Sequence, residues 1–330
     1  MQEGFRIWAN PSSPHAEGRK AKAALEDART RVKAALGWDG EIIFTSGASE
    51  ALWIALNRAK ANRRIVSTVE HDAVFRAAPD AEIMPHGDGP LVSTANLRDA
   101  LGGGGKAVVA VQHMNSETGV MQPLFELAPL VREAGGILLS DCSQSAGKHK
   151  LPDADMIVIS AHKFGGPIGI GALLVRKFDM LEPGGGHERG YRQGTENLPA
   201  AMGMAAAIEK WRPEAAQPIS AVGDTLTELA DLVRERGGQV VNGGGMTSMF
   251  ITAIAHPTLS AQAQLIRLDA MGFAVSAGSA CSSGTLKKSR VLDAFGVSDE
   301  VASRTVRVSV GWNTTADELE QFKDAWISLT

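Results

Sequence analysis

The chain has 330 residues, 44% hydrophobic and 21% charged, which is typical of a globular protein large enough for two domains or one large α/β unit. Its net charge of −4, without a long basic run, argues against binding to the phosphate backbone of nucleic acids. The N-terminus resembles no secretion signal, and no apolar run approaches the roughly 18 residues of a membrane span. Two distant cysteines, Cys142 and Cys281, form neither a disulfide framework nor a zinc knuckle. We therefore expect a cytoplasmic protein with no metal site and no membrane partner.

The first half of the chain alternates between short apolar runs and helical patterns. Continuous β-branched runs bounded by turn residues are typical of strands buried on both faces. Helical spacing of Ala and Leu predicts helices over residues 16–36 and 122–134, ended by Gly37 and Gly135. This alternation predicts a mostly parallel sheet with helices on both faces. In chain order, the predicted strands span residues 41–45, 64–68, 107–111, 136–141, 156–160 and 171–175.

The pattern changes after about residue 205. A glycine-rich, polar loop interrupts residues 176–200. Residues 315–318 then fit a capping box that opens the last helix. We predict a large domain over residues 1–205 and a smaller α/β domain over residues 206–330. In the second domain, helices over 219–236, 259–271 and 315–328 alternate with the strands MFITAIA, FAVSA and RTVRVSV.

The strongest chemical signal is a carboxylate and an amine that follow neighbouring predicted strands. Asp141 ends one strand, and Lys163 comes directly after another, in the sequence SAHK. Ligands of open α/β sheets bind beyond the carboxyl ends of the strands, so both groups should reach one crevice. A lysine that holds an aldehyde as a Schiff base and a carboxylate that keeps a pyridine nitrogen protonated are what pyridoxal phosphate chemistry requires. The alternative is that Lys163 is a solvated surface charge.

A candidate phosphate site lies in FTSGASE, residues 44–50, where a strand passes through a glycine into the helical sequence EALWIALNRA. Backbone N–H groups at the start of that helix, with the Ser49 hydroxyl, would form an anion cradle. Many α/β turns look like this, so the motif gains weight only together with Asp141 and Lys163.

Three further side chains each allow two interpretations. His71 follows a predicted strand and either stacks on a cofactor ring or is an ordinary loop histidine. Asn115 either contacts a cofactor oxygen or the substrate carboxylate, or serves turn chemistry. Arg307 either clamps a substrate carboxylate with two hydrogen bonds or is a surface residue of a strand.

Nine sequence blocks follow one another along the chain: NPSSPHAEGR (10–19), FTSGASE (44–50), STVEH (67–71), MNSETGVMQP (114–123), DCSQSAGK (141–148), SAHKFGGPIGIGALLVR (160–176), GGGHERGYRQGTEN (184–197), SAGSACSSG (276–284) and RVSVG (307–311). In this order, and over residues 10 to about 328, they resemble the signature blocks of cysteine desulfurases of the NifS/IscS type. These are class V, fold-type I PLP-dependent transferases, so the resemblance implies an α/β fold with a pyridoxal 5'-phosphate-binding large domain and a smaller C-terminal domain.

The resemblance implies a role for each matching residue. Lys163 would form the Schiff base and move the Cα proton, and Asp141 would pair with the pyridine nitrogen. Arg307 would hold the substrate carboxylate, and Thr195 would contact the phosphate of a partner subunit, which makes a homodimer part of the site. Gln144 and Asn115 would contact the phenolic oxygen, His71 would stack on the ring, and the phosphate would be held by Ala48, Ser49, Ser160 and His162.

Cys281 lies in a run of small residues, from Ser276 to Thr285, which gives a sulfur carrier reach because such residues resist ordering. By the resemblance its thiolate would take the sulfur of L-cysteine, release L-alanine and carry a persulfide to an acceptor protein. The sequence leaves the acceptor open among an iron–sulfur scaffold, a transfer-RNA thiolation enzyme and cofactor biosynthesis. Lys287 and Lys288 are the nearest positive charges in sequence that could stabilise a thiolate. We expect Cys142, in contrast, to be a packed thiol without redox function.

The sequence departs from the family pattern in a few places. Nine residues precede Asn10, so the N-terminal segment is expected to be shortened. Trp312 stands where an arginine is usual, Lys287 and Lys288 replace a common Glu-Pro pair, and Ser49 replaces a threonine. A selenocysteine lyase or class V aminotransferase is the alternative within the same fold. An impaired scaffold that binds a sulfur-transfer partner is the alternative from another class.

Overall fold

The computed structural model describes residues 1–87, 89–211, 219–277 and 289–329, which form two compact units. The first unit comprises Met1–Met84, Leu97–His113 and the described residues from Pro123 to 211. The second comprises Pro85–Asn96, Met114–Gln122 and the described residues from 219 onward. Two short segments from the N-terminal half therefore belong to the second unit. The domain limits expected from the sequence, 1–205 and 206–330, stay a prediction.

The described part of the first unit contains a seven-stranded sheet in the order β1-β7-β6-β5-β4-β2-β3. Strand β7 runs antiparallel to β1 and β6, and all other neighbours are parallel, so six strands point the same way. This confirms the predicted mostly parallel sheet. The strands are β1 (Glu41–Thr45), β2 (Arg63–Ser67), β3 (Glu82–Met84), β4 (Ala107–Ala110), β5 (Ile137–Asp141), β6 (Met156–Ser160) and β7 (Gly171–Val175).

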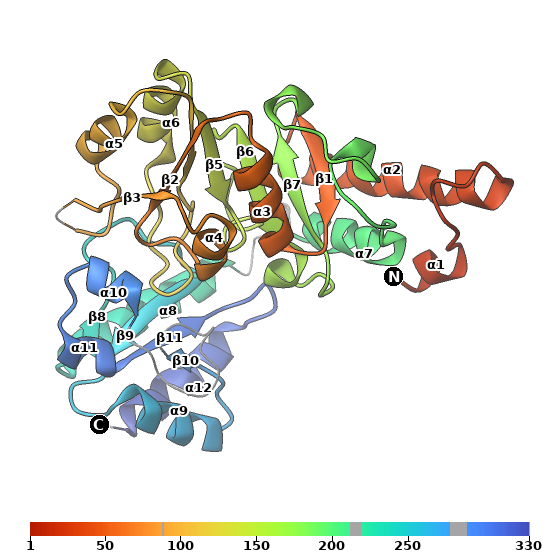
Figure 1. Ribbon diagram of the computed structural model, residues 1–330. Coiled ribbons are helices and arrows are strands. Elements are labelled where there is room, and N and C mark those ends of the chain that lie inside the picture. Colours follow the sequence, from red (N-terminus) through yellow and green to blue (C-terminus); the bar gives the residue numbers. More distant parts are fainter. Residues whose placement is uncertain (88, 212–218, 278–288, 330) are drawn as a thin grey trace. The chain divides into compact units, whose positions relative to one another are not determined.

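The central strands are buried on both faces because helices cover the sheet. Every residue of β4, β6 and β7 is buried, which explains their continuous apolar sequences. Helix α3 (Ala48–Arg58) packs against β6 and β7, and Figure 1 shows it crossing in front of these strands. Helix α6 (Leu124–Glu133) packs against β5. The other helical elements of the first unit include α1 (Gln2–Arg6), α4 (Asp72–Ala77), η1 (Ala161–Phe164), η2 (Phe178–Met180) and η3 (Glu188–Gly190).

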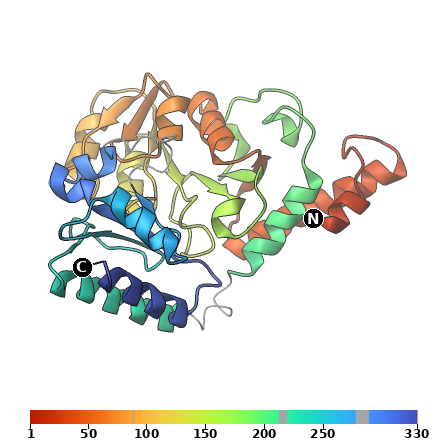
Figure 2. The ribbon, with the colours of Figure 1, turned by 90° about the horizontal axis from the view of Figure 1, so that it is seen from below.

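Helix α2 (Ala16–Leu36) has the limits that the sequence predicts. The His15 ring accepts a hydrogen bond from the Gly18 N–H at its start, and Gly37 ends it at a φ of 62°, a left-handed value that favours glycine. Figure 2 shows α2 side by side with α7 (Leu198–Glu209), and the two helices pack closely. Helix α5 (Thr94–Leu101) has residues in both units.

The described part of the second unit contains an antiparallel sheet in the order β10-β11-β9-β8. Helices α8 and α12 lie side by side in Figure 2, and Trp326 of α12 is fully buried against the His256 ring, with ring centroids 5.4 Å apart. The predicted capping box at Thr315 and Glu318 is confirmed. The elements are β8 (Gln239–Val240), β9 (Ile251–Ala255), β10 (Ser276–Ala277), β11 (Thr305–Ser309), α8 (Ile219–Glu235), α9 (Ala261–Ala270), α10 (Arg290–Ala294), α11 (Asp299–Ser303) and α12 (Ala316–Ile327).

The predicted strand FAVSA, residues 273–277, is shorter in the structure. Of these residues, only Ser276 and Ala277 pair with β11, and Phe273 packs edge-on against Phe322, with ring centroids 5.6 Å apart. None of the helices in the described ranges combines the length and the apolar character needed to cross a membrane.

Candidate active site

The candidate residues of the first unit follow the carboxyl ends of its parallel strands. Asp141, at the end of β5, is in register with Val158 of β6, two residues before Ser160. Neighbouring strands lie about 4.8 Å apart, so Asp141 and the segment after Ser160 leave the sheet at one edge and from adjacent strands. The structure therefore brings Asp141 and Lys163 to the same edge of the sheet, as the sequence predicts.

Lys163 lies in the short helix η1, directly after β6. Gly165 closes this turn at a φ of 80°, and the N–H groups of Gly165 and Gly166 both donate to the Ala161 carbonyl. A Cβ atom on Gly166 would lie 2.9 Å from that carbonyl oxygen, so a side chain there would push the turn open. Within the turn, Ala161 and Phe164 are buried, whereas His162 and Lys163 are exposed. The buried residues anchor the turn, and the two basic side chains extend from it.

Ser160 and His162 form a polar pair beside Lys163. The Ser160 Oγ lies 3.0 Å from the His162 Nδ1. Partial desolvation lowers the pKa of this largely exposed His162 ring below its ordinary value, and the positive charge of Lys163 lowers it further. Both effects favour the neutral imidazole, which can still donate a hydrogen bond to an anion.

Asp141 is half-buried and opens the turn that carries Gln144. One carboxylate oxygen, Oδ1, accepts a hydrogen bond from the Ser143 N–H at 2.8 Å. The Ser143 hydroxyl oxygen is buried and makes no hydrogen bond to the described residues. Cys142 is fully buried, and burial raises the pKa of its thiol to about 12. Such a thiol is unreactive, which agrees with the expected packing role.

The candidate phosphate turn joins β1 to α3. Gly47 is the N-cap residue and supplies no capping side chain, so the first N–H groups of the helix remain available to an anion. Ala48 is half-buried and Ser49 is exposed at this point. A Cβ atom on Gly171, the first residue of β7, would lie 2.8 Å from the Gly47 backbone. The turn therefore packs against β7 only because Gly171 lacks a side chain.

Glu50, in the first turn of α3, fixes the same turn through its side chain. Its carboxylate accepts a hydrogen bond from the Ser46 N–H at 2.5 Å and pairs with Arg192 at 3.2 Å. Burial opposes ionisation, but the Ser46 hydrogen bonds and the Arg192 charge outweigh it and lower the pKa of Glu50. Arg192 also donates to the backbone carbonyl of Thr195 at 3.4 Å. The exposed Thr195 thus lies on a loop that is tied to the phosphate turn of its own chain.

His71 follows β2 and is the N-cap residue of α4. Its Nδ1 accepts a hydrogen bond from the Ala73 N–H at 3.2 Å, which fixes the plane of the half-buried ring. Capping accounts for one ring nitrogen, and the stacking role stays a prediction.

The second unit contains Asn115 and Arg307. The half-buried Arg307 guanidinium donates to the Ser116 carbonyl at 2.8 Å and to the Ser276 hydroxyl at 3.1 Å. The buried Asn115 Oδ1 accepts hydrogen bonds from the N–H groups of Glu117 and Thr118, at 2.8 and 3.0 Å. The structure thus brings Arg307 to the turn that Asn115 begins, and the Asn115 oxygen serves turn chemistry. Cys281, Lys287 and Lys288 lie outside the described residues.

A buried ion pair that the sequence analysis missed holds the loop of residues 184–197. The Glu188 carboxylate pairs with Arg29 at 2.8 Å and accepts the Phe44 N–H at 2.9 Å. Glu188 and Arg189 have φ values of 47° and 56°, which is strained for residues with side chains. The partners are 159 positions apart, so their spacing gave no signal.

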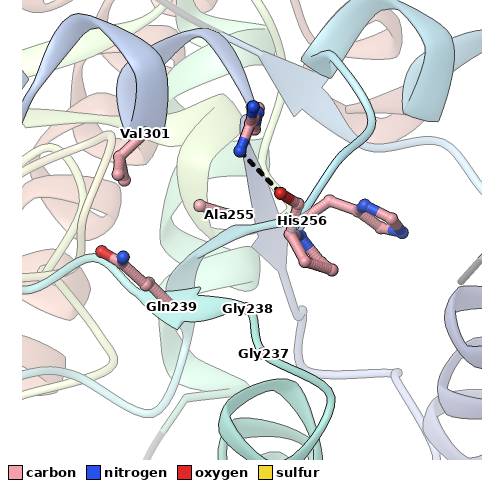
Figure 3. Close-up of a pocket in the computed structure, with 8 residues that line it drawn as sticks. Gly237, Gly238, Gln239, Ala255, His256 and Val301 are labelled. Carbon is pink, nitrogen blue, oxygen red and sulfur yellow. Dashed lines mark hydrogen bonds between the residues drawn. The ribbon is translucent and has the colours of Figure 1, made fainter.

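A small pocket in the second unit contains none of the candidate residues (Figure 3). Its volume of about 50 Å³ suits a few water molecules rather than a substrate. The His256 Nδ1 beside it accepts hydrogen bonds from the Thr258 and Leu259 N–H groups at 3.1 and 2.9 Å, so this histidine stabilises a turn. The pocket is lined by residues 237–239 and 255–257, Val301 and Arg304.

Known proteins resemble this chain in sequence and in fold. Residues 2–322 match the family model described as aminotransferase class V. The chain is 33% identical to the cysteine desulfurase IscS of Dictyoglomus turgidum, over 96% of this chain and 86% of that protein. Among solved structures, a NifS-like protein from Rickettsia africae matches 99% of this chain and 94% of its own, with a TM-score of 0.88 and 26% identity. The structure described as SspA in complex with cysteine matches 94% of each chain, with a TM-score of 0.77 and 28% identity.

The family model, the relatives and the solved structures all match this chain over nearly its whole length. The chain belongs to the class V aminotransferase family and, within it, to the cysteine desulfurases.

Proposed function

We propose that this protein is a pyridoxal-phosphate-dependent cysteine desulfurase. It takes L-cysteine and an enzyme thiol, and it gives L-alanine and an enzyme persulfide. One carbon–sulfur bond breaks, one sulfur–sulfur bond forms, and the alanine carbon gains a proton, so the step needs no external oxidant. The observation that carries the proposal is the position of Asp141 and Lys163 after adjacent parallel strands of one sheet edge.

Enzymes of this family use pyridoxal phosphate, and the residues of the first unit fit it. Asp141 supplies a carboxylate, Lys163 supplies an amine, and the start of α3 supplies N–H groups for a phosphate. A Cβ atom at Gly171 would meet the Gly47 backbone at 2.8 Å, so glycine is required to form this cradle. The buried Ser143 hydroxyl without a partner in the described residues offers one further polar contact beside Asp141.

When bound, the cofactor supplies an electron sink for the reaction at the substrate carbons. Lys163 would hold it and move the proton of the substrate Cα, while the Asp141 carboxylate would keep the pyridine nitrogen protonated. The N–H groups and hydroxyl of Ala48 and Ser49, together with Ser160 and His162, would bind the phosphate. His71 would pack against the ring, and Gln144 and Asn115 would contact its phenolic oxygen.

The substrate is bound and attacked by the remaining residues. Arg307 holds the carboxylate of L-cysteine, because a guanidinium can donate two parallel hydrogen bonds to it. The Cys281 thiolate attacks the substrate sulfur and then carries it to an acceptor protein. The relative described as SspA in complex with cysteine supports this choice of substrate. Thr195 is exposed, which suits its expected contact with the phosphate of the second subunit in a homodimer.

The experiment is a turnover assay on the protein reconstituted with pyridoxal phosphate. Alanine formation from L-cysteine is measured, and the protein-bound persulfide is located by mass spectrometry. We expect one alanine per sulfur transferred, with the persulfide on Cys281, and neither product from Cys281→Ala. The matched control is Cys142→Ser, which changes only the buried thiol and should keep the activity.

Full turnover by Cys281→Ala would show that Cys281 is not the nucleophile. It would favour a selenocysteine lyase or an aminotransferase, which need no cysteine at this position. A reconstituted protein that binds the cofactor but releases no alanine would instead indicate a scaffold.

A further inference from the structure

Two buried polar residues, Gln112 and His113, follow β4 and have no part in the proposed reaction. They are 4% and 8% exposed. Strand β4 lies between β5, which leads to Asp141, and β2, which leads to His71. The dipeptide therefore emerges between two candidate cofactor contacts.

His113 bonds to the Asp141 turn at two points. Its backbone N–H donates to the Asp141 carbonyl at 3.0 Å, and its ring Nδ1 lies 2.9 Å from the Ser145 Oγ. The N–H groups of Ser145 and Ala146 both bond to the Cys142 carbonyl, so Ser145 belongs to the same tight turn. Gln144 lies between the two points that His113 holds.

Gln112 makes the corresponding bonds on the other side. Its backbone N–H donates to the Glu70 Oε1 at 2.8 Å, and its side-chain amide donates to the Val69 carbonyl at 2.7 Å. The same Glu70 oxygen accepts from the Ser67 hydroxyl at 2.6 Å. Glu70 is the residue before His71, so these bonds fix the backbone from which the His71 ring projects.

The His113 ring can make its bond without bringing charge to the site. Burial, and to a smaller extent the neighbouring His149, with ring centroids 6.5 Å apart, together lower the pKa of His113 to about 4. A permanently charged side chain at this place would compete with the pyridine nitrogen for the Asp141 carboxylate. A neutral hydrogen-bonding ring fixes the turn and leaves the Asp141 charge for its ligand.

We propose that His113 is a positioning residue for the cofactor: through Ser145 and the Asp141 carbonyl it fixes the two side chains, Asp141 and Gln144, that face the pyridine ring. Gln112 fixes the segment before His71 in the same way. This inference rests on the proposed function, because it concerns the same cofactor site. It predicts that substitutions at His113 change the affinity for the cofactor and the ionisation of the bound cofactor, and not only the rate of turnover.

The test compares His113→Leu, His113→Asn and Ser145→Ala with the full-length parent protein. Pyridoxal phosphate is titrated into each apoprotein to give a Kd, and the visible band of each loaded protein is followed as a function of pH. Leucine has a similar size but cannot form a hydrogen bond to Ser145. We therefore expect the Kd for pyridoxal phosphate to rise roughly 10-fold and the pH midpoint of the visible cofactor band to shift. Asparagine places an amide near the position of Nδ1 and should recover most of the affinity. Ser145→Ala should reproduce the effect of leucine in a smaller degree.

The matched control is His149→Gln, which alters the adjacent ring but leaves the bond from His113 to Ser145 in place. It should bind the cofactor and titrate like the parent. Parent-like affinity and pH midpoint in both His113→Leu and Ser145→Ala would overturn the proposal. So would a loss of affinity that follows the melting temperature equally in all four variants, since that would mean a structural role only. If His113→Leu does not fold, Ser145→Ala, which removes one oxygen, carries the test.

The result for the parent protein separates the two levels of inference. If the parent does not bind pyridoxal phosphate, the proposed function fails, and the role of His113 fails with it. If the parent binds the cofactor and forms alanine while the variants behave like the parent, only the role of His113 is wrong.

Discussion

The two units hold their candidate residues by different means. In the first unit, backbone geometry places Asp141 and Lys163: Asp141 ends a strand, and Lys163 lies in a turn closed by Gly165 and Gly166. In the second unit, Arg307 is positioned by the hydrogen bonds that its own guanidinium donates to Ser116 and Ser276.

We expect the two units to differ in role in the same way. The sheet edge of the first unit would hold the cofactor, and Arg307 of the second unit would bind the substrate carboxylate. We therefore expect substitutions in the first unit to change cofactor binding and the chemical step. Substitutions around Arg307 should change the KM for cysteine and leave the spectrum of the bound cofactor unchanged.

Lys163→Ala should have the largest effect. Removal of the amine abolishes the covalent attachment of the cofactor and the proton transfer at the substrate Cα, so kcat should fall by at least about 10³-fold. Alanine release from L-cysteine measures this. Lys150→Ala, which removes an exposed lysine of the same unit, should keep the parent rate. Substantial turnover by Lys163→Ala would remove the basis for assigning the chemistry to the first unit.

Arg307→Leu should raise the KM for L-cysteine by roughly 10- to 100-fold, because the substrate carboxylate loses a charged hydrogen-bond donor. The visible spectrum with pyridoxal phosphate should remain that of the parent. Steady-state kinetics and absorbance on the same sample give both values. Arg267→Leu, an exposed arginine of α9, is the control. Loss of the visible cofactor absorbance together with an unchanged KM for L-cysteine would contradict the assignment of substrate binding to Arg307.

Gly171→Ala should destabilise the first unit by about 1–3 kcal/mol, because the new methyl group overlaps the Gly47 backbone and the Ile159 carbonyl. It should also weaken cofactor binding, since the phosphate turn must move. Denaturant unfolding and titration with pyridoxal phosphate measure the two effects. A stability loss without any change in cofactor affinity would argue that the start of α3 does not hold the phosphate.

Acid should destabilise the first unit through His113. The ring in the unfolded chain takes up a proton as the pH falls below about 6.5, whereas burial keeps the pKa of the folded ring at about 4. The unfolded state therefore gains protons first, and stability falls as the pH falls from about 6.5 toward 4. Between pH 7 and pH 5 this one ring accounts for about 1–2 kcal/mol. The free energy of unfolding of the parent and of His113→Asn is measured at both pH values. An equal loss of stability between pH 7 and pH 5 in the two proteins would contradict this role of His113.

The sequence predicted the sheet of the first unit well because local signals were strong there. The run MIVIS at residues 156–160 and the run GALLV at residues 171–175 are strands with these limits, since both faces are buried and every position is apolar. Gly37 marked the end of α2 for a local reason, its left-handed φ. The antiparallel direction of β7 was not foreseen, because burial pattern carries no information on strand direction.

Signals were weaker where contacts join distant segments. Of FAVSA only two residues form a strand, and Phe273 contacts Phe322, which lies 49 positions further along the chain. The bond between His113 and Ser145 joins residues 32 positions apart and has no sequence signature. Asp141 and Lys163 could be placed together from the sequence, because residues that follow the carboxyl ends of parallel strands lie at the same edge of the sheet.

The most direct test of the central claim is to identify the residue that binds the cofactor. The protein is loaded with pyridoxal phosphate, reduced with borohydride to make the attachment permanent, digested and analysed by mass spectrometry. We predict a single pyridoxyl-modified peptide with the label on Lys163, and loss of that label in Lys163→Ala, while Asp141→Ala should lower the cofactor affinity. A label on any other lysine, or no label on a folded protein, would contradict the account.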